Sequence, residues 1–151
     1  MAGALDGLVV VDLTSHLSGP YAAMMLADHG ADVLKIERPD GGDDARRMPP
    51  FIEGESAPFM VWNRNKRSVA LDLKSAEGKA RLLELVDGAD ILIENMRPGV
   101  MDKLGLGYAG VRAPGRACTG SAYDGGPGEP AEGAWQQVTA AGPVQVAEEA
   151  V

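Results

Sequence analysis

Acids outnumber bases in this chain, and the bases cluster at a few places within its first 100 residues. The 14 lysines and arginines face 22 aspartates and glutamates, so the net charge is −8. Guanidinium and ammonium groups bind phosphates through charge-assisted hydrogen bonds. The clusters therefore indicate an anionic ligand, but they could also be solvated charges that balance nearby acids, and the residues alone favour this second interpretation. The bases concerned are Arg38, Arg46, Arg47, Arg64, Lys66, Arg67, Lys74 and Arg97.

The elements that must position these bases alternate between strands and helices. Apolar runs predict strands at residues 8–13 (LVVVDL), 32–37 (DVLKIE), 68–73 (SVALDL) and 90–94 (DILIE). Between them, the patterns predict helices over residues 21–29 and 76–86, a helical turn at 59–63 and a helix starting at 100–104, with a long loop at 40–58. Strands spaced by helices predict an α/β fold with a parallel sheet and helices on both faces. Such sheets bind ligands at the carboxyl ends of their strands.

Three residues mark the ends of the expected helices. Pro20 suits the first turn of a helix, where its missing N–H would have no partner anyway. Gly30 is expected to end that helix. Ser75 is a candidate N-cap for the helix over residues 76–86.

A dinucleotide site is one alternative for the edge of the sheet. Glu37 ends the second expected strand, where the ribose-binding acid of such folds lies. However, the first turn reads TSHLSGP and lacks the G-x-G-x-x-G glycines that let a backbone approach a pyrophosphate. The sequence therefore disfavours a dinucleotide.

Few residues are placed for nucleophilic or metal chemistry. His16 lies beside Ser15 and Ser18, but neighbours on a turn rarely form a nucleophile–base pair, so a polar loop histidine is favoured. His29 is expected at a helix C-terminus, where a cation is favourable. Two histidines and one cysteine, Cys118, provide no metal motif, no disulfide framework and no reactive thiol.

Composition excludes several classes of protein. An acidic chain is not a general nucleic-acid binder. No apolar run is long enough to predict a membrane span, and the N-terminus lacks the basic segment of a secretory signal. We therefore expect a cytoplasmic protein.

The last part of the chain differs in composition from the rest. After Leu106 there is no Leu, Ile, Phe or Met, and after Arg116 there is no base. Glycine, alanine, proline and acids dominate, so this part has little apolar surface to offset its ordering entropy. We therefore expect a working domain over residues 5–111 and a low-order acidic tail over residues 112–151, which is disordered or the product of a frameshift.

Consecutive motifs in the working domain resemble one family. They are LDG, LVVVDLT, SGP, LADHGADVLKIERPDGGD, NRNKRSVALDLKSAEGK and ADILIENMRPGVMDKLGLGY. In this order they resemble the class III coenzyme A transferases of the CaiB/BaiF type, from Leu5 to Tyr108 without an obvious gap. The resemblance implies a Rossmann-like large domain that holds CoA, here incomplete, a second small domain, and an interlocked homodimer. It favours the phosphate interpretation of the bases.

The resemblance also assigns CoA contacts to residues of this chain. The turn before Gly-Pro, at the nucleotide end, corresponds to His16, Leu17 and Ser18, where Leu17 replaces the glutamine of the formyl-CoA transferase pattern. The resemblance also implies that Arg38 contacts a phosphate and the adenine, that Leu71 lies on the adenine side, and that Lys74 lies near the 3′-phosphate. It further implies pantetheine contacts at Asn95 and Met96 and a phosphate-binding base at Lys103.

The catalytic residues of the family have no recognisable counterpart. In the transferases, an Asp well beyond the LGLGY motif attacks the acyl-CoA and forms a mixed anhydride, then an enzyme CoA thioester. Asp124 follows Tyr108 too closely for this role. We therefore expect a truncated acyl-CoA:carboxylate CoA-transferase that binds CoA, needs no metal and is inactive alone. The alternatives are a fragment of the α-methylacyl-CoA racemase branch, although no histidine follows His29, and a non-catalytic CoA-binding module or pseudoenzyme.

Overall fold

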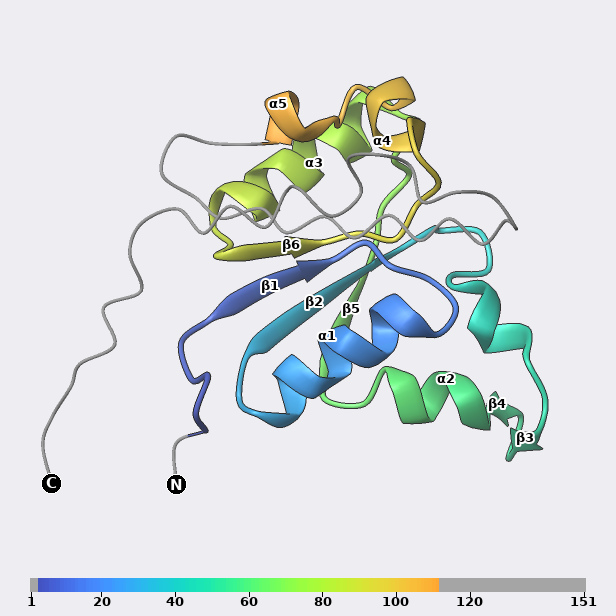
Figure 1. Ribbon diagram of the computed structural model, residues 1–151. Coiled ribbons are helices and arrows are strands. Elements are labelled where there is room, and N and C mark those ends of the chain that lie inside the picture. The colour runs from blue at the N-terminus through green and yellow to red at the C-terminus, as the bar shows by residue number, and fades with distance from the viewer. Residues whose placement is uncertain (1–2, 112–151) are drawn as a thin grey trace, which may run out of the picture.

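The apolar runs expected to be strands form a parallel sheet. A computed structural model describes residues 3–111 of the chain. Its four-stranded sheet has the order β5-β2-β1-β6, and all three neighbouring pairs are parallel (Figure 1). This confirms the predicted α/β class. The strands are β1 (Val9–Asp12), β2 (Asp32–Glu37), β5 (Lys66–Ala70) and β6 (Ile91–Ile93).

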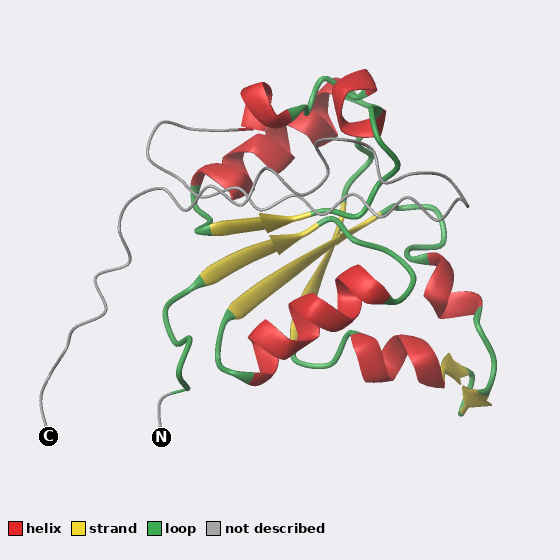
Figure 2. Cartoon of the chain, viewed as in Figure 1, coloured by secondary structure: helices red, strands yellow, loops and turns green. Residues whose placement is uncertain are grey.

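Helices cover both faces of this sheet, as expected (Figure 2). Successive residues of β1 point to opposite faces, so Val10 packs on helix α1 (Ser18–Asp28) and Val11 packs on helix α3 (Ala76–Asp87). Helices α4 (Val100–Lys103) and α5 (Tyr108–Val111) lie on the α3 side (Figure 1). Helix α2 (Ala57–Trp62) lies beside α1. The strands are therefore buried from both sides, which explains their nearly continuous apolar sequence.

The predicted helix ends are partly right. Helix α1 begins at Ser18, three residues before the expected start, and Pro20 lies in its first turn. Gly30 follows the C-cap with a φ of 106°, which glycine adopts readily. The N-cap of α3 is confirmed, because Ser75 Oγ accepts a hydrogen bond of 2.9 Å from the amide of Gly78.

The third strand of the sequence was predicted too far along the chain. Residues 68–73 were expected, but β5 begins at Lys66 and ends at Ala70. The register with β2 places Lys66 opposite Val33 and Ala70 opposite Glu37, so two basic residues open the strand. The sequence pattern missed this start because charged residues hid it.

The expected long loop at residues 40–58 is wrong, because it contains short elements. A 3₁₀ helix, η1 (Asp44–Arg47), is followed by a hairpin of β3 (Phe51–Ile52) and β4 (Glu55–Ser56) and by the start of α2. Side chains cap both helices: Asp43 Oδ1 accepts a bond from the Ala45 amide, and Ser56 Oγ from the Phe59 amide. The helical turn expected at residues 59–63 is therefore the end of a helix that starts at Ala57.

Residues 3–111 contain neither a membrane-spanning helix nor a cluster of metal ligands. No helix in this part of the chain combines the length and apolar character needed to cross a membrane. The same residues contain no group of three or more His, Cys, Asp or Glu side chains that could hold a metal ion. Cys118, Asp124 and the expected tail at 112–151 lie outside the described residues.

Candidate ligand-binding pocket

A pocket of about 620 Å³ opens at the carboxyl edge of the sheet. Its walls come from the segments that follow β1, β2 and β5 and from the segment between β6 and α4 and beyond. The chain leaves β1 towards β2 and β5 on one side and returns to β6 on the other. Such a switch point is where open α/β sheets bind their ligands, and the volume is in the range of small-molecule sites.

The structure brings four of the nine expected CoA contacts together at this pocket. They are Arg38 after β2, Leu71 and Lys74 after β5, and Met96 after β6. Asn95 lies beside the pocket, where its side-chain amide bonds both the N–H and the carbonyl of Ser15 at 2.9 Å. The other four, which do not line the pocket, are the exposed residues His16, Leu17, Ser18 and Lys103.

Arg38 is held at the pocket mouth by acidic and backbone partners. Its guanidinium donates to the Gly42 carbonyl at 3.0 Å and to Asp44 Oδ1 at 2.8 Å. Asp44 also pairs with Arg47, and the hydrogen bond from Arg38 is the main reason that the pKa of Asp44 is lowered. Because Arg47 can neutralise Asp44 alone, Arg38 can turn towards a ligand without leaving that carboxylate unpaired.

Glu37 at the end of β2 is fully engaged by the protein. Its two carboxylate oxygens accept bonds from Arg46 (2.6 and 2.7 Å), Ser68 Oγ (2.6 Å) and the Asp43 amide (2.9 Å). Burial would raise the pKa of Glu37, but these donors outweigh it and lower the pKa to about 2. With both oxygens occupied, the carboxylate is not available to a ribose, which agrees with the absence of a dinucleotide motif.

For several of the bases, the structure supports the interpretation as balancing charges. Arg46 binds Glu37 and stacks on Phe59 at 3.8 Å. The three bases before and within β5 bind acids of α1, β2 and β1: Arg64 with Asp28, Arg67 with Asp32, and Lys66 with Asp12. Among residues 3–111, in contrast, Lys74 and Arg97 form no ion pair.

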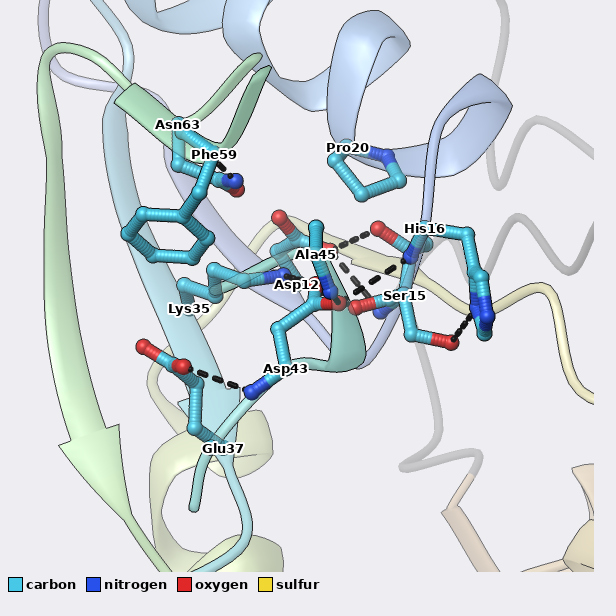
Figure 3. Close-up of polar contacts among 12 residues, drawn as sticks. Asp12, Ser15, His16, Pro20, Lys35, Glu37, Asp43, Ala45, Phe59 and Asn63 are labelled. Atoms are coloured by element: carbon cyan, nitrogen blue, oxygen red, sulfur yellow. Dashed lines mark hydrogen bonds and ion pairs between the residues drawn. The ribbon is translucent and has the colours of Figure 1, made fainter. Parts of the chain in front are cut away.

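The sequence interpretation missed a buried charge network behind the pocket wall. Lys35 pairs with Asp43 and Lys66 pairs with Asp12, each at 2.9 Å, and none of these side chains is more than 1% exposed. Figure 3 shows Asp12, Lys35 and Asp43 beside the turn that carries Ser15 and His16. A signal was present: Asp12 and Lys35 interrupt otherwise apolar runs, and a charge in a buried strand requires a partner.

His16 on the first turn forms a side-chain hydrogen bond with the neighbouring Ser15. Ser15 Oγ and His16 Nδ1 are 3.2 Å apart, a contact between adjacent residues of the same turn. Asp43 accepts a hydrogen bond of 3.2 Å from the main-chain N–H of His16 but does not bond its imidazole ring. No other carboxylate of residues 3–111 bonds the imidazole either. The orienting third group of a nucleophilic triad is thus missing from the described residues.

Comparison with known proteins decides the family. The model of CoA-transferase family III matches residues 5–141, which is most of the chain. The chain belongs to CoA-transferase family III. An acetyl-CoA:oxalate CoA-transferase of Acetobacter aceti is 48% identical over 106 residues, and a succinyl-CoA:mesaconate CoA-transferase of Haloarcula hispanica is 49% identical over 115 residues. These matches cover 70% and 73% of this chain but only 27% and 29% of the two relatives.

Solved structures of the same family have a similar fold. A CAIB/BAIF family protein from Brucella suis superimposes with a TM-score of 0.74 at 39% identity, over 80% of this chain and 33% of that one. A hypothetical protein from Mycobacterium tuberculosis gives a TM-score of 0.74 at 41% identity, over 84% and 36% of the two chains. The resemblance drawn from the motifs is thus confirmed, and the chain spans about a third or less of these family members.

Proposed function

We propose that the pocket at the carboxyl edge of the sheet binds the nucleotide end of a coenzyme A thioester. One observation carries this proposal: Arg38 and Lys74, from loops after two neighbouring strands, both line a pocket whose other walls combine eight apolar residues with five carboxylates. CoA carries a pyrophosphate and a 3′-phosphate on an adenosine, so it needs both cations and apolar surface. Membership in a family of CoA-transferases supports the same ligand.

The cations differ in how freely they can meet a phosphate. Lys74 is exposed and has no ion pair within residues 3–111, so its ammonium is available to the 3′-phosphate. Asp44 forms ion pairs with both Arg38 and Arg47. Arg38 can therefore turn to a phosphate while Asp44 stays paired with Arg47. Each new charge-assisted hydrogen bond would contribute about 1.5–3 kcal/mol.

Aliphatic side chains form the part of the pocket suited to adenine and pantetheine. Leu13 and Ile36 are buried at the ends of β1 and β2, and Leu71 lies after β5. Met96, a flexible and polarisable side chain, lines the pocket after β6. These residues offer stacking and van der Waals contact without competing for the phosphates.

The reaction follows from the relatives. Those compared above are named as CoA-transferases between an acyl-CoA and a carboxylic acid, and we propose the same reaction class for the whole protein. We further propose that residues 1–151 alone bind CoA without transferring it. In support, four of the five carboxylates that line the described pocket are engaged by the protein: Glu37, Asp43 and Asp44 in ion pairs, and Asp72 by the Lys74 amide. The fifth, Asp40, forms no ion pair within residues 3–111. Turnover of acetyl-CoA or succinyl-CoA with a dicarboxylate by this chain would contradict that part.

The remaining CoA contacts implied by the resemblance stay proposals. His16 and Leu17 lie on the turn that follows the lining residues Thr14 and Ser15, and Ser18 begins α1 directly after it. Asn95 fixes that turn through Ser15. Lys103 lies on α4, whose Val100 lines the pocket while Lys103 does not. Lys103 reaches a phosphate only if its side chain bends towards the mouth.

We also propose that the whole protein is an interlocked homodimer, as the family resemblance implies. Leu17, the N-cap of α1, and Tyr21 and Met25 on the helix are spaced four residues apart and are each about half exposed. An apolar stripe of this kind supports a covering partner.

Isothermal titration of the 151-residue chain with CoA tests the binding proposal. We expect Lys74→Ala to raise the dissociation constant by about tenfold, the loss of roughly one charge-assisted bond. Lys79→Ala is the matched control, since Lys79 carries the same charge on α3 and does not line the pocket. Equal effects of both variants would show that net charge, and not this site, governs binding. Lys103→Ala in the same series decides whether Lys103 belongs to the site.

A further inference from the structure

Two buried ion pairs lie at the end of the sheet that carries the pocket, and one of their members, Asp43, lines it. Lys35 comes from the middle of β2, Asp12 ends β1, Lys66 opens β5, and Asp43 precedes η1. The charges interact as a group, because Asp43 and Lys35 both act on the Lys66 ammonium together with Asp12. Burying two ion pairs costs desolvation that their attraction hardly repays. Stability alone is therefore a weak explanation for the network.

What the Lys35–Asp43 pair does is hold two backbone segments at fixed points. Lys35 Nζ donates to the Thr14 carbonyl at 2.9 Å. Asp43 Oδ1 accepts from the His16 amide at 3.2 Å and from the Ala45 amide at 2.9 Å, and Figure 3 shows Asp43 between these partners. One buried pair thus joins the turn of residues 14–17 to the segment of residues 42–47.

The turn is held in a conformation that it would not adopt freely. His16 has a φ of 70°, in the left-handed region that residues with a Cβ disfavour. Such a conformation persists when its surroundings fix it. Two sets of hydrogen bonds fix this turn: the His16 amide donates to Asp43, and the Asn95 side chain forms two hydrogen bonds with the backbone of Ser15.

We infer that Lys35 and Asp43 are positioning residues for the ligand of this pocket. Thr14, Ser15, Gly42 and Asp44, which line it, lie on the two segments that the pair joins. The Lys35 and Asp43 side chains are only 1% exposed; Lys35 does not line the pocket, and Asp43 lines it with its carboxylate already bound to backbone amides, so we assign both a role through the backbone. The inference rests on the proposed function, because it takes CoA as that ligand.

A purely structural role makes a different prediction from a positioning role. If the pair only stabilises the fold, variants lower the melting temperature and leave the affinity of the folded molecules unchanged. If the pair positions the turn, affinity falls even where the variant is fully folded. The experiment must therefore separate stability from affinity.

Two double variants of the full chain make this separation. Lys35→Met with Asp43→Asn removes both charges together, so no buried charge is left unpaired, and the carboxamide oxygen can still accept from the His16 and Ala45 amides. Lys35→Met with Asp43→Ala removes the charges and that acceptor. Val10→Ala, a fully buried residue at the other end of β1, controls for loss of stability.

We expect CoA titration, well below the melting temperatures, to rank the variants by their acceptor. The Asn variant, which loses the Lys35 bond to the Thr14 carbonyl but keeps the Asp43 acceptor, should raise the dissociation constant less than the Ala variant, which should raise it about tenfold, or about 1.4 kcal/mol. Val10→Ala should lower the melting temperature without changing the constant. Wild-type affinity in the Ala variant, or an equal loss in Val10→Ala, overturns the inference.

Amide hydrogen exchange separates failure of this inference from failure of the proposed function. If the wild-type chain does not bind CoA at millimolar concentration, the proposed function fails, and with it the ligand named here. The positioning of the turn is then decided by the His16 and Ala45 amides. Faster exchange of both in the Ala variant than in the Asn variant supports it, and unchanged exchange overturns it.

Discussion

At the scale of single residues, the carboxylate of Glu37 shows how position alone misleads. It ends β2, where a ribose-binding acid would lie, yet four donors from the protein occupy it. The sequence disfavoured a dinucleotide, because the G-x-G-x-x-G glycines are missing. It could not predict the partner, since Arg46 reaches Glu37 only when η1 folds back over β2.

The lowered pKa of Glu37 makes stability depend on pH in a defined window. The pKa falls from an ordinary 4.5 to about 2 in the folded chain, so the stabilisation is complete above pH 4.5 and is lost as the pH falls towards 2. The full effect is on the order of 3 kcal/mol. We expect Glu37→Gln to be less stable than wild type near neutral pH, and the difference in the free energy of unfolding to shrink below pH 4.5.

Urea unfolding from pH 2 to 7 measures this difference. Asp32→Asn is a suitable control, because Asp32 is exposed and its ion pair with Arg67 lies on the surface. A stability difference for Glu37→Gln that stays constant over the whole pH range would show that the carboxylate is not the titrating group.

At the scale of elements, apolar periodicity was a good guide only where burial dominates. Strands β1 and β2 follow apolar runs, and both were predicted within a residue or two. The start of β5 and the elements between residues 40 and 58 were missed because side-chain caps and ion pairs hold them. For the pocket, the loops after the strands could be predicted, whereas the buried Lys35–Asp43 pair depends on contacts between distant segments.

Gly42 is the element-scale position where a small change should disturb the pocket wall. Its φ is 65°, and a Cβ there would lie 2.5 Å from Glu37 Oε2 and 2.8 Å from Arg46. We expect Gly42→Ala to lower the free energy of unfolding by about 1–3 kcal/mol through backbone strain and overlap. Gly54→Ala is the matched control, because Gly54 has a φ of 89° but nothing within 4 Å of its Cβ position. If urea unfolding gave the same loss of unfolding free energy for both variants, backbone strain would explain the effect without the overlap at Gly42.

At the scale of the whole molecule, the half-exposed apolar side chains of α1 are where the proposed partner subunit would pack. Met25→Lys and Tyr21→Lys place charges on the half-exposed stripe, and we expect them to shift any self-associated chain towards the monomer in sedimentation velocity. Their affinity for CoA should be unchanged, since neither residue lines the pocket. Leu83→Lys, on an exposed position of α3, is the control. If all three variants disperse the protein equally, general solubility and not the stripe explains the effect.

The claim that CoA binds at the carboxyl edge of the sheet is tested most directly by an NMR titration. With the ¹⁵N-labelled 151-residue chain and CoA, we predict saturable amide shift changes at the pocket segments around Thr14, Arg38, Lys74 and Met96. The N-terminal halves of β1 and β2 should remain unaffected. The absence of shifts at millimolar CoA, or shifts confined to other surfaces, would contradict the account.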